Sequence, residues 1–314
     1  MTIGAVLPLK VTGSYGVDDL NRAHILFSSL DRFAEPGLFS EFYVVVPADE
    51  VGIVEQAFAR WAHLGIKVLS ENELVPELAN YPKMRGWRKQ QVVKLAIASK
   101  MQAKFYLTFD ADAICLKAIS KETLLPEGKA LLQYEFRAQH PKWWKSSARI
   151  LKMNPNVGDP AVGMTVTPAM LSVELAKKLQ QEITRLHGKH WVDFLGQLHI
   201  PSSPLNWLPH RILMLKWTEY SLYYLCARKL GLLEQYHVIA GTAPYPQRLL
   251  VHESHPYEQW DTAYSFSNRC PGLFCVVGSK TFLAPAEVWA KVGPFIRADN
   301  EISNLLAATN RVQS

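Results

Sequence analysis

The chain lacks several features that would assign it to a large class of proteins at once. None of its apolar runs reaches the roughly 18 to 20 residues that a membrane-spanning helix needs. Residues 1–10 contain an apolar stretch without a basic leader, which is not typical of a signal peptide. The four cysteines are Cys115, Cys226, Cys270 and Cys275, and no two of them have the CxxC spacing of a zinc site. These absences predict a protein of the reducing cytoplasm without structural zinc.

Motifs for nucleic acids and dinucleotides are missing as well. The sequence contains no helix-turn-helix pattern, zinc finger or RNP-type aromatic motif, so nucleic acid is not an expected partner. The net charge of +6 and the isoelectric point near 9.0 still favour anionic partners, such as nucleotides or a phospholipid surface. Residues 8–19 include Gly13 and Gly16 but no GxGxxG, which argues against a dinucleotide cofactor.

What the sequence does contain is a regular alternation of apolar strands and amphipathic helices in its first third. We expect strands at residues 5–11, 41–47, 66–69 and 104–113, and helices at 18–33, 51–63 and 86–101. Strands that alternate with helices form mostly parallel sheets with helices on both faces. The predicted fold class is therefore α/β with a Rossmann-like sheet.

The pattern changes after residue 128. We expect strands at 129–135, 248–252 and 274–278, helices at 167–187, 216–230, 284–292 and 298–308, an irregular basic segment at 137–160 and a proline-rich stretch at 200–209. No repeat or clear linker divides the chain. We therefore predict one continuous domain over residues 1–314, with a nucleotide-binding half (1–115) and an acceptor-binding half (116–314).

Two aspartates at the end of an apolar strand are the strongest chemical signal. Phe105-Tyr106-Leu107-Thr108-Phe109 leads into Asp110 and Asp112. In an extended chain residues i and i+2 point the same way, so we expect both carboxylates to converge at the carboxyl end of the strand. Ligands of open α/β sheets bind at that edge. Two hard oxygen ligands predict a Mn²⁺ or Mg²⁺ site that could bridge a diphosphate.

The order of elements and several short sequence segments resemble a GT-A type glycosyltransferase. The segments that carry the resemblance are Asp18-Asp19 with Arg22, Ser29-Leu30-Asp31-Arg32-Phe33, Tyr43-Val44-Val45-Val46-Pro47, and the W-x-x-Q-Q-x-x-K-L string from Trp87 to Leu95 with the DxD after it. They are similar to a bacterial family of polysaccharide glycosyltransferases. The likeness spans residues 5–115 and continues more weakly through 162–168 and 218–220. It implies transfer of a hexosyl or deoxyhexosyl unit from a nucleotide diphosphate sugar to a glycan or lipid-linked acceptor.

The resemblance also implies residues that contact the donor. Lys94, on the helix before the DxD strand, matches a lysine that contacts the donor diphosphate or sugar, and Gln91 lies on the same helix face at i−3. Asp110 would bind the donor as well as the metal. The turn that contains Lys10 and Asp18 would lie over the nucleotide, although Asp18 suits the N-cap of the next helix equally well.

The second half offers a base and a further metal ligand. Glu219 follows Thr218 at the start of a helix, where an inverting GT-A enzyme often holds the carboxylate that deprotonates the acceptor. A role in stabilising the first helical turn is as well supported by position alone. GT-A enzymes often complete the metal shell with a C-terminal histidine, and His255 is the candidate, with His252 as the alternative.

Three alternatives stay open from the sequence. The basic segment 137–152 with its paired Trp143 and Trp144 could form a lid over the diphosphate, a peripheral contact with the inner face of the membrane, or a solvated loop. The chain could also be a nucleotidyltransferase acting on sugar phosphates, which its first loop disfavours. It could finally be a non-catalytic relative that binds nucleotide sugars.

Overall fold

A five-stranded sheet forms the centre of the molecule, with the strand order β3-β2-β1-β4-β9. The strands are β1 (Ile3–Pro8), β2 (Phe39–Val46), β3 (Ile66–Ser70), β4 (Phe105–Thr108) and β9 (Ala169–Ser172). The first four are parallel, and β9 runs antiparallel to β4. The computed structural model describes residues 2–11, 13, 16, 18–164, 167–199, 212–241, 259–278, 281 and 283–296.

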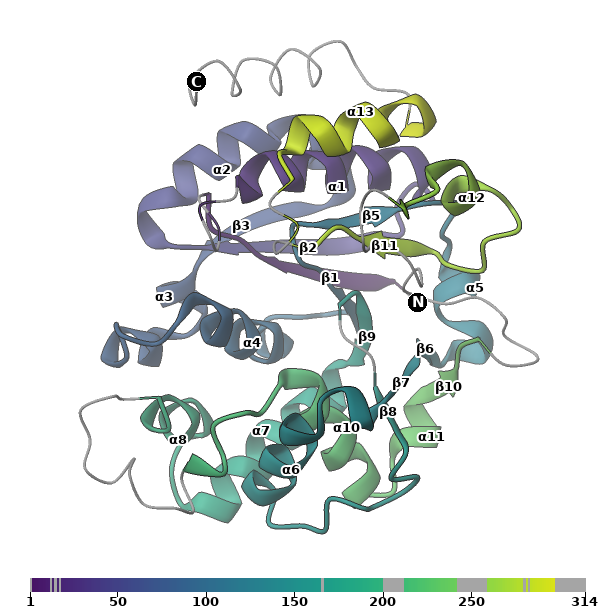
Figure 1. Ribbon diagram of the computed structural model, residues 1–314. Coiled ribbons are helices and arrows are strands. Elements are labelled where there is room, and N and C mark those ends of the chain that lie inside the picture. Colours follow the sequence, from purple (N-terminus) through teal and green to yellow (C-terminus); the bar gives the residue numbers. More distant parts are fainter. Residues whose placement is uncertain are drawn as a thin grey trace.

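Helices cover both faces of the sheet, which explains why its central strands have nearly continuous apolar sequences. Every residue of β1 is buried, as is every residue of β2 except Ser40. Helices α1 (Asp19–Phe33), α2 (Val51–Phe58) and α13 (Pro285–Ile296) lie on one face, and α4 (Gly86–Ala96) lies on the other (Figure 1). The predicted mostly parallel α/β sheet is therefore confirmed.

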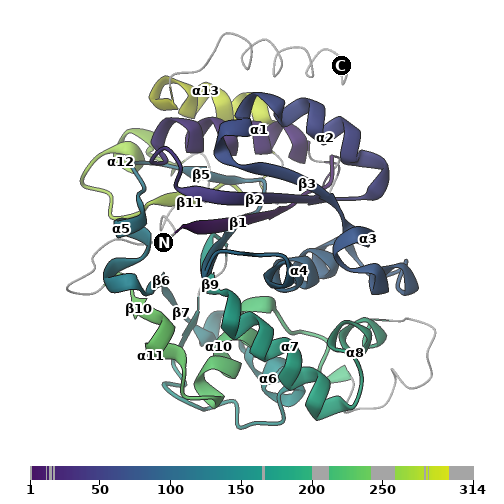
Figure 2. The ribbon, with the colours of Figure 1, turned by 180° about the vertical axis from the view of Figure 1, so that it is seen from behind.

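Most of the described residues between 137 and 236 form a helical lobe beside α4, whereas α13 returns to the opposite face of the sheet. The lobe contains α6 (Pro141–Ile150), α7 (Val173–His187), α8 (Trp191–Gln197) and α10 (Glu219–Lys229), which Figure 2 shows from behind. The described residues also form three small two-stranded sheets: β5 (Ala113–Cys115) with β11 (Phe274–Val276), β6 (Ala130–Leu132) with β10 (His237–Ile239), and β7 (Tyr134–Phe136) with β8 (Val162–Met164). No helix among the described residues has the length and apolar character to cross a membrane.

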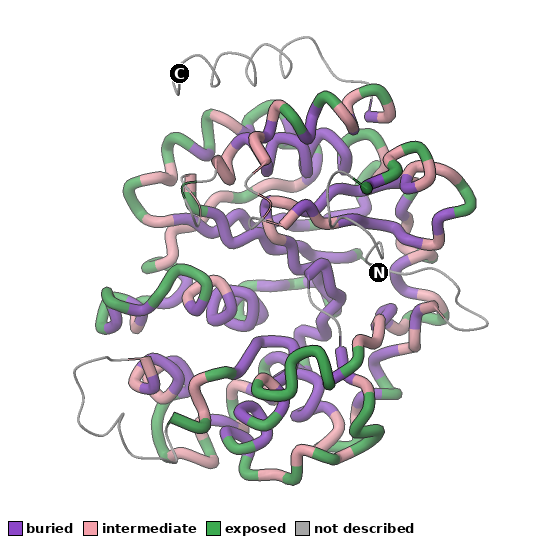
Figure 3. Tube along the Cα trace, viewed as in Figure 1, coloured by how far each residue is buried: buried purple, intermediate pink, exposed green. Residues whose placement is uncertain are grey.

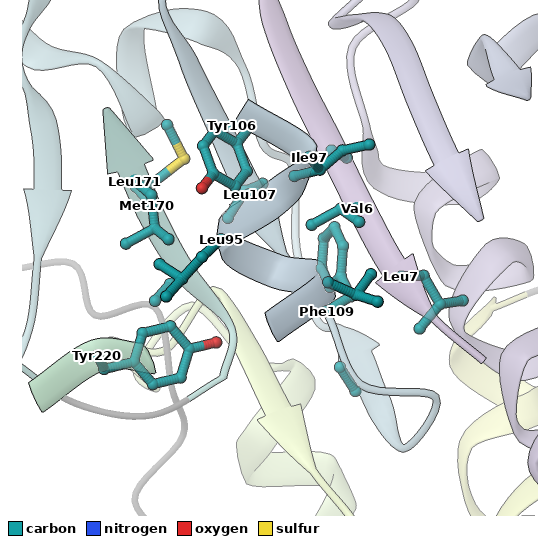
Figure 4. Packing of buried hydrophobic residues seen from close by; sticks show 14 of the residues in the cluster. Val6, Leu7, Leu95, Ile97, Tyr106, Leu107, Phe109, Met170, Leu171 and Tyr220 are labelled. Atoms are coloured by element: carbon teal, nitrogen blue, oxygen red, sulfur yellow. The ribbon is translucent and has the colours of Figure 1, made fainter. Parts of the chain in front are cut away.

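One continuous apolar core connects the sheet to this lobe. In the burial-coloured trace the buried segments run from the helices above the sheet through to the centre of the lobe (Figure 3). Leu95 and Ile97 pack against β4 and β9, and Tyr220 of α10 lies beside Leu95 (Figure 4). The first turn of α10 is therefore fixed next to the sheet by apolar packing.

The sheet contains a topological switch point between β1 and β4. The chain moves outward from β1 through β2 to β3, and then crosses back to place β4 on the other side of β1. Adjacent connections therefore leave β1 and β4 in opposite directions. The carboxyl ends of such strands border the crevice in which open α/β sheets bind ligands.

Two predictions for the second half are wrong. Residues 169–172 form strand β9, and the helix predicted from residue 167 begins at Val173, where Ser172 accepts a hydrogen bond from the amide of Leu175. Residues 141–150 of the supposedly irregular basic segment form α6, whose inner face buries Trp144 and Ile150. The strand predicted at 248–252 and the helix predicted at 298–308 lie outside the described residues.

The packing of Trp144 makes Gly163 a sensitive position. A methyl group on Gly163 would lie 2.1 Å from the Trp144 ring, whereas one on Gly52 of α2 would meet nothing within 4 Å. We expect Gly163→Ala to lower the free energy of unfolding by about 1–3 kcal/mol through overpacking. Gly52→Ala should leave it unchanged or raise it by about 0.5 kcal/mol, because Ala restricts the unfolded chain. Urea unfolding of both variants measures this, and equal stabilities would contradict the packing.

Candidate functional site

The side chain of Lys94 is the centre of a buried polar cluster. Its Nζ atom lies 2.7 Å from Oδ1 of Asp110 and 3.4 Å from Oε1 of Glu219. It also donates to Oγ1 of Thr167 at 2.7 Å, and it lies 3.4 Å from the hydroxyl of Tyr220. Burial alone would lower the pKa of Lys94, but Asp110, Tyr220 and Glu219 raise it above its ordinary value. The amine therefore stays protonated, with its three N–H groups directed to acceptors.

Tyr220 connects this lysine to the sheet. Its hydroxyl shares hydrogen bonds of 2.7 Å with Thr108 of β4 and with Thr167. Thr108 donates its own proton to the carbonyl of Ala169, so the Tyr220 proton goes to Thr108. The Tyr220 oxygen is then left to accept from Thr167 and Lys94. The hydrogen bonds therefore all run the same way, from Lys94 through Thr167 and Tyr220 to Thr108. They orient the ammonium group toward the carboxylates.

Glu219 occupies the first turn of α10, where Thr218 and Ser221 form a capping box. The residue is only 4% exposed. Burial raises the pKa of Glu219, and the nearby Lys94 offsets part of that rise. A carboxylate predicted from a distant part of the sequence thus shares one cation with Asp110.

The two aspartates of the DxD lie on a turn, not on an extended strand. β4 ends at Thr108, and the amide of Ala113 donates to the carbonyl of Asp110 at 3.1 Å, which closes a four-residue turn. A turn, and not the strand alternation that we predicted, therefore positions the two carboxylates, and they stay close enough for the charge of Asp110 to raise the pKa of Asp112. Asp110 is 40% exposed, whereas the side chain of Asp112 is 12% exposed. We call this turn of residues 110–113 the acid turn; it leaves one carboxylate open to solvent and folds the other inward.

Asp112 is a buried acid among other acids. Burial and the charge of Asp110 raise its pKa to about 7, against the opposing effect of Arg22, whose Nη1 lies 3.9 Å from Oδ2 of Asp112. The same Nη1 lies 3.9 Å from Oδ1 of Asp19, whose pKa burial raises to about 6. One guanidinium therefore faces two carboxylates, with a third close by. This excess of negative charge favours a cation.

The donor atoms of this acid group fit a hard divalent ion. Oδ1 of Asp112 is buried without a hydrogen-bond partner, and Asp110 presents its carboxylate to solvent. Such oxygen atoms suit Mg²⁺ or Mn²⁺. Within the described residues, however, no group of three or more His, Cys, Asp or Glu side chains could by itself hold a metal. His252 and His255, the predicted additional ligands, lie outside those residues.

The other predicted donor residues have different surroundings. Lys10 is exposed just beyond the carboxyl end of β1, next to the switch point. Asp18 is the N-cap of α1 and accepts from the amide of Asn21 at 2.9 Å. Gln91 is 2% exposed, its Oε1 accepts from Arg88 at 3.1 Å, and its Nε2 has no partner. These positions leave the donor role of all three as a prediction.

Sequence reasoning missed several groups that organise the site. Thr108 and Thr167 bind Tyr220, and Arg22 faces the acids. A hydroxyl inside the apolar run Phe105-Tyr106-Leu107-Thr108-Phe109 and an arginine inside the buried stretch of α1 are signals that could have been followed. A buried polar side chain needs a partner, so its presence indicates an internal network.

The fold and the acid turn at its switch point define an α/β protein of the GT-A type. The chain belongs to a family of unknown function, DUF6492, which it matches over residues 1–300. No curated protein sequence matches it. The more specific bacterial polysaccharide family inferred from the W-x-x-Q-Q-x-x-K-L string stays a prediction.

Solved structures support the fold assignment. Mouse xyloside xylosyltransferase 1, in its apo form, aligns with a TM-score of 0.50 and 13% identity over 90% of this chain and 99% of that one. At this identity the likeness concerns the fold alone. Glucosyl-3-phosphoglycerate synthase from Mycobacterium tuberculosis, in complex with Mn²⁺, UDP and glucosyl-3-phosphoglycerate, aligns with a TM-score of 0.35 and 18% identity over 68% and 77%. The structural similarity to this second protein is too low to support an inference.

Replacing Lys94 should show how strongly the cluster depends on its charge. Lys94→Met leaves Asp110 and Glu219 without their cation, and we expect the free energy of unfolding to fall by about 3 kcal/mol. Lys89→Met, on the same helix, removes a partly exposed pair with Glu71 at 3.5 Å and should cost less than about 1 kcal/mol. Urea unfolding compares them. Similar losses in the two variants would mean that the Lys94 ammonium is hydrated in the folded protein.

The raised pKa of Asp112 predicts opposite pH effects without and with metal. The folded protein holds the Asp112 proton more tightly than the unfolded chain, so this group's contribution to stability falls as pH rises from about 4 to about 7. Asp112→Asn removes that fall, which thermal melts of the metal-free proteins over this range would detect. Mn²⁺ needs the ionised carboxylate and should raise the melting temperature more at about pH 8 than at about pH 5.5. A Mn²⁺ effect that is unchanged in the variant would exclude Asp112 as a ligand.

Proposed function

We propose that this protein is a metal-dependent glycosyltransferase that uses a nucleotide diphosphate sugar as donor. The observation that carries the proposal is the contact of Lys94 with both Asp110 and Glu219. A cation suited to phosphate, a carboxylate suited to a metal and a buried carboxylate suited to proton transfer lie around one point. That point is next to the carboxyl ends of the switch-point strands, which supports a ligand site there.

The donor would bind with its diphosphate near the acid turn. Asp110 and Asp112 would hold Mn²⁺ or Mg²⁺, and the donor phosphates or water would complete the shell. When bound, the ion would neutralise charge on the diphosphate as it leaves. Lys94 would add a second positive charge beside the same group, and Lys10 at the end of β1 would lie toward the nucleotide. Asp18 and Gln91 would shape this half of the site through the elements that they cap or support.

Glu219 would act as the base of an inverting transfer. Its raised pKa makes it a better proton acceptor than an exposed glutamate. Lys94 would hold the carboxylate in place, and the acceptor hydroxyl would lose its proton to Glu219 as its oxygen forms the new bond to the sugar carbon. A single displacement of this kind inverts that carbon.

The fold adds support by analogy only. The mouse protein that shares it is by name a xylosyltransferase. We propose that residues 1–115 bind the donor and that the helical lobe binds a glycan or lipid-linked acceptor. Contact of segment 137–152 with a membrane surface stays a prediction, with one change. Trp144 is 3% exposed and packs inside the lobe, so it is not available as an interfacial anchor.

A donor panel tests the proposal most directly. UDP-, GDP- and dTDP-sugars are added with Mn²⁺, and the melting temperature and the release of nucleoside diphosphate are measured. We expect one nucleotide class to stabilise the wild-type protein and to be hydrolysed slowly. Asp110→Asn should lose both effects. Pyrophosphate release from a nucleoside triphosphate and a sugar phosphate would indicate a nucleotidyltransferase, and binding without any turnover would indicate a non-catalytic relative.

Glu219→Gln tests the proposed mechanism. The substitution keeps the size of the side chain and removes the proton acceptor, so donor binding should persist while turnover falls by roughly 10² to 10⁴. NMR of the wild-type product should show an anomeric configuration opposite to that of the donor. Retained configuration in the product, or normal turnover by the variant, would remove Glu219 from the mechanism and leave it as a structural partner of Lys94.

A further inference from the structure

Two indole rings form a small shelf at the outer end of α4. Trp87, in the first turn of α4, is 45% exposed, although most large apolar side chains of the described residues are buried. The ring of Trp143, from α6, lies 6.3 Å from it at an interplanar angle of 41°. We call this pair the tryptophan shelf. It is formed by the contact of two helices that are far apart in the sequence.

Neighbouring side chains hold both rings of the tryptophan shelf in place. The guanidinium of Arg88 lies 4.4 Å from the centre of the Trp87 ring, and it is fixed in turn by donating to the carbonyls of Trp217 and Leu215. His140 stacks on the Trp143 ring at 3.8 Å and 17°. A ring that is already oriented loses little freedom when a ligand covers it. The tryptophan shelf is therefore prepared for a flat partner.

The position of the tryptophan shelf relates it to the proposed active site. Trp87, Gln91 and Lys94 occupy positions i, i+4 and i+7, which lie on one face of a helix. Seven residues of helix span about 10 Å. Between the two ends, Nε2 of Gln91 is a buried donor without an acceptor, and a group of that kind needs an explanation in a folded protein. The same helix face thus connects the exposed indole, an unsatisfied amide and the lysine that holds Glu219.

We propose that the tryptophan shelf is an acceptor subsite that binds a pyranose ring one or more sugar units away from the reacting hydroxyl. One face of many pyranoses consists of C–H groups polarised by the ring oxygens, and the negative face of an indole attracts them. The hydroxyl groups at the edge of the sugar stay hydrated. This inference rests on the proposed function and adds that the acceptor is an oligosaccharide rather than a single sugar.

A lipid surface is the competing occupant, because tryptophan also favours membrane interfaces. Two observations favour the sugar. Trp144, the other half of the paired tryptophans, is buried and cannot insert. The exposed Trp87 is covered on one side by a guanidinium, and it continues the helix face that leads to Lys94. A docking point for lipid would not need that alignment.

Saturation-transfer NMR with maltose, cellobiose, lactose and chitobiose tests the subsite on the intact protein, without donor or metal. We expect at least one disaccharide to receive saturation, and Trp87→Ala to weaken its binding at least about tenfold. Trp87→Phe should retain part of the binding because it keeps an aromatic face. Ile53→Ala is the matched control, since Ile53 is an apolar residue of α2 with a similar exposure of 52%. Absence of binding for all four sugars, or equal binding by Trp87→Ala and wild type, would overturn the proposal.

Two further measurements separate the possible failures. Nucleotide-sugar binding with Mn²⁺ should be the same in Trp87→Ala and wild type, so its absence in both would refute the proposed function and leave the sugar result to stand alone. Sedimentation with vesicles that contain phosphatidylglycerol examines the lipid alternative. Vesicle binding that is lost in Trp87→Ala, together with no disaccharide binding, would assign the tryptophan shelf to a membrane instead.

Discussion

The burial of a protonated lysine imposes the main constraint on this structure. Lys94 is 2% exposed. Its ammonium group contacts Asp110, Glu219, Thr167 and Tyr220 in place of water. An unpaired buried charge is strongly destabilising, so these partners must all come together when the chain folds. They belong to the acid turn after β4, the loop before β9 and the first turn of α10. The lysine therefore ties the sheet to the helical lobe at the point where the proposed chemistry takes place.

The balance of charge around the acid turn continues the same argument. Lys94 compensates the charges of Asp110 and Glu219, whereas Arg22 faces Asp19 and Asp112 at the longer distance of 3.9 Å. Burial is the main cause of the raised pKa values of Asp19 and Asp112, and the distant Arg22 compensates it only in part. A site with spare negative charge and an unpartnered carboxylate oxygen is suited to take up a divalent ion with its ligand. Perturbed acids in such a place are typical of functional sites.

Much of the fold could be predicted because its signals are local. The apolar runs of β1, β2 and β4 and the helical spacing of α1 and α4 are set by neighbours in the sequence. The errors arose where a local pattern had more than one solution. Thr167 and Pro168 resemble a helix start, but residues 169–172 pair with β4, and tertiary pairing decides between strand and helix. The basic residues of α6 concealed a helix whose inner face is made by Trp144 and Ile150.

For the site, the sequence established which residue types are present and the order in which they occur. It pointed to Asp110 and Asp112 after one strand, to Lys94 on a helix and to Glu219 on another helix, as candidates on three separate elements. The folded protein alone shows that Lys94 contacts both Asp110 and Glu219 and that Asp112 is turned inward toward Arg22. It also shows that Tyr220 joins α10 to β4 and to the loop before β9. The physical reason is range. Helix caps and strand alternation act over a few residues, whereas the pairing of a buried charge joins positions 125 residues apart, and no local pattern encodes that distance.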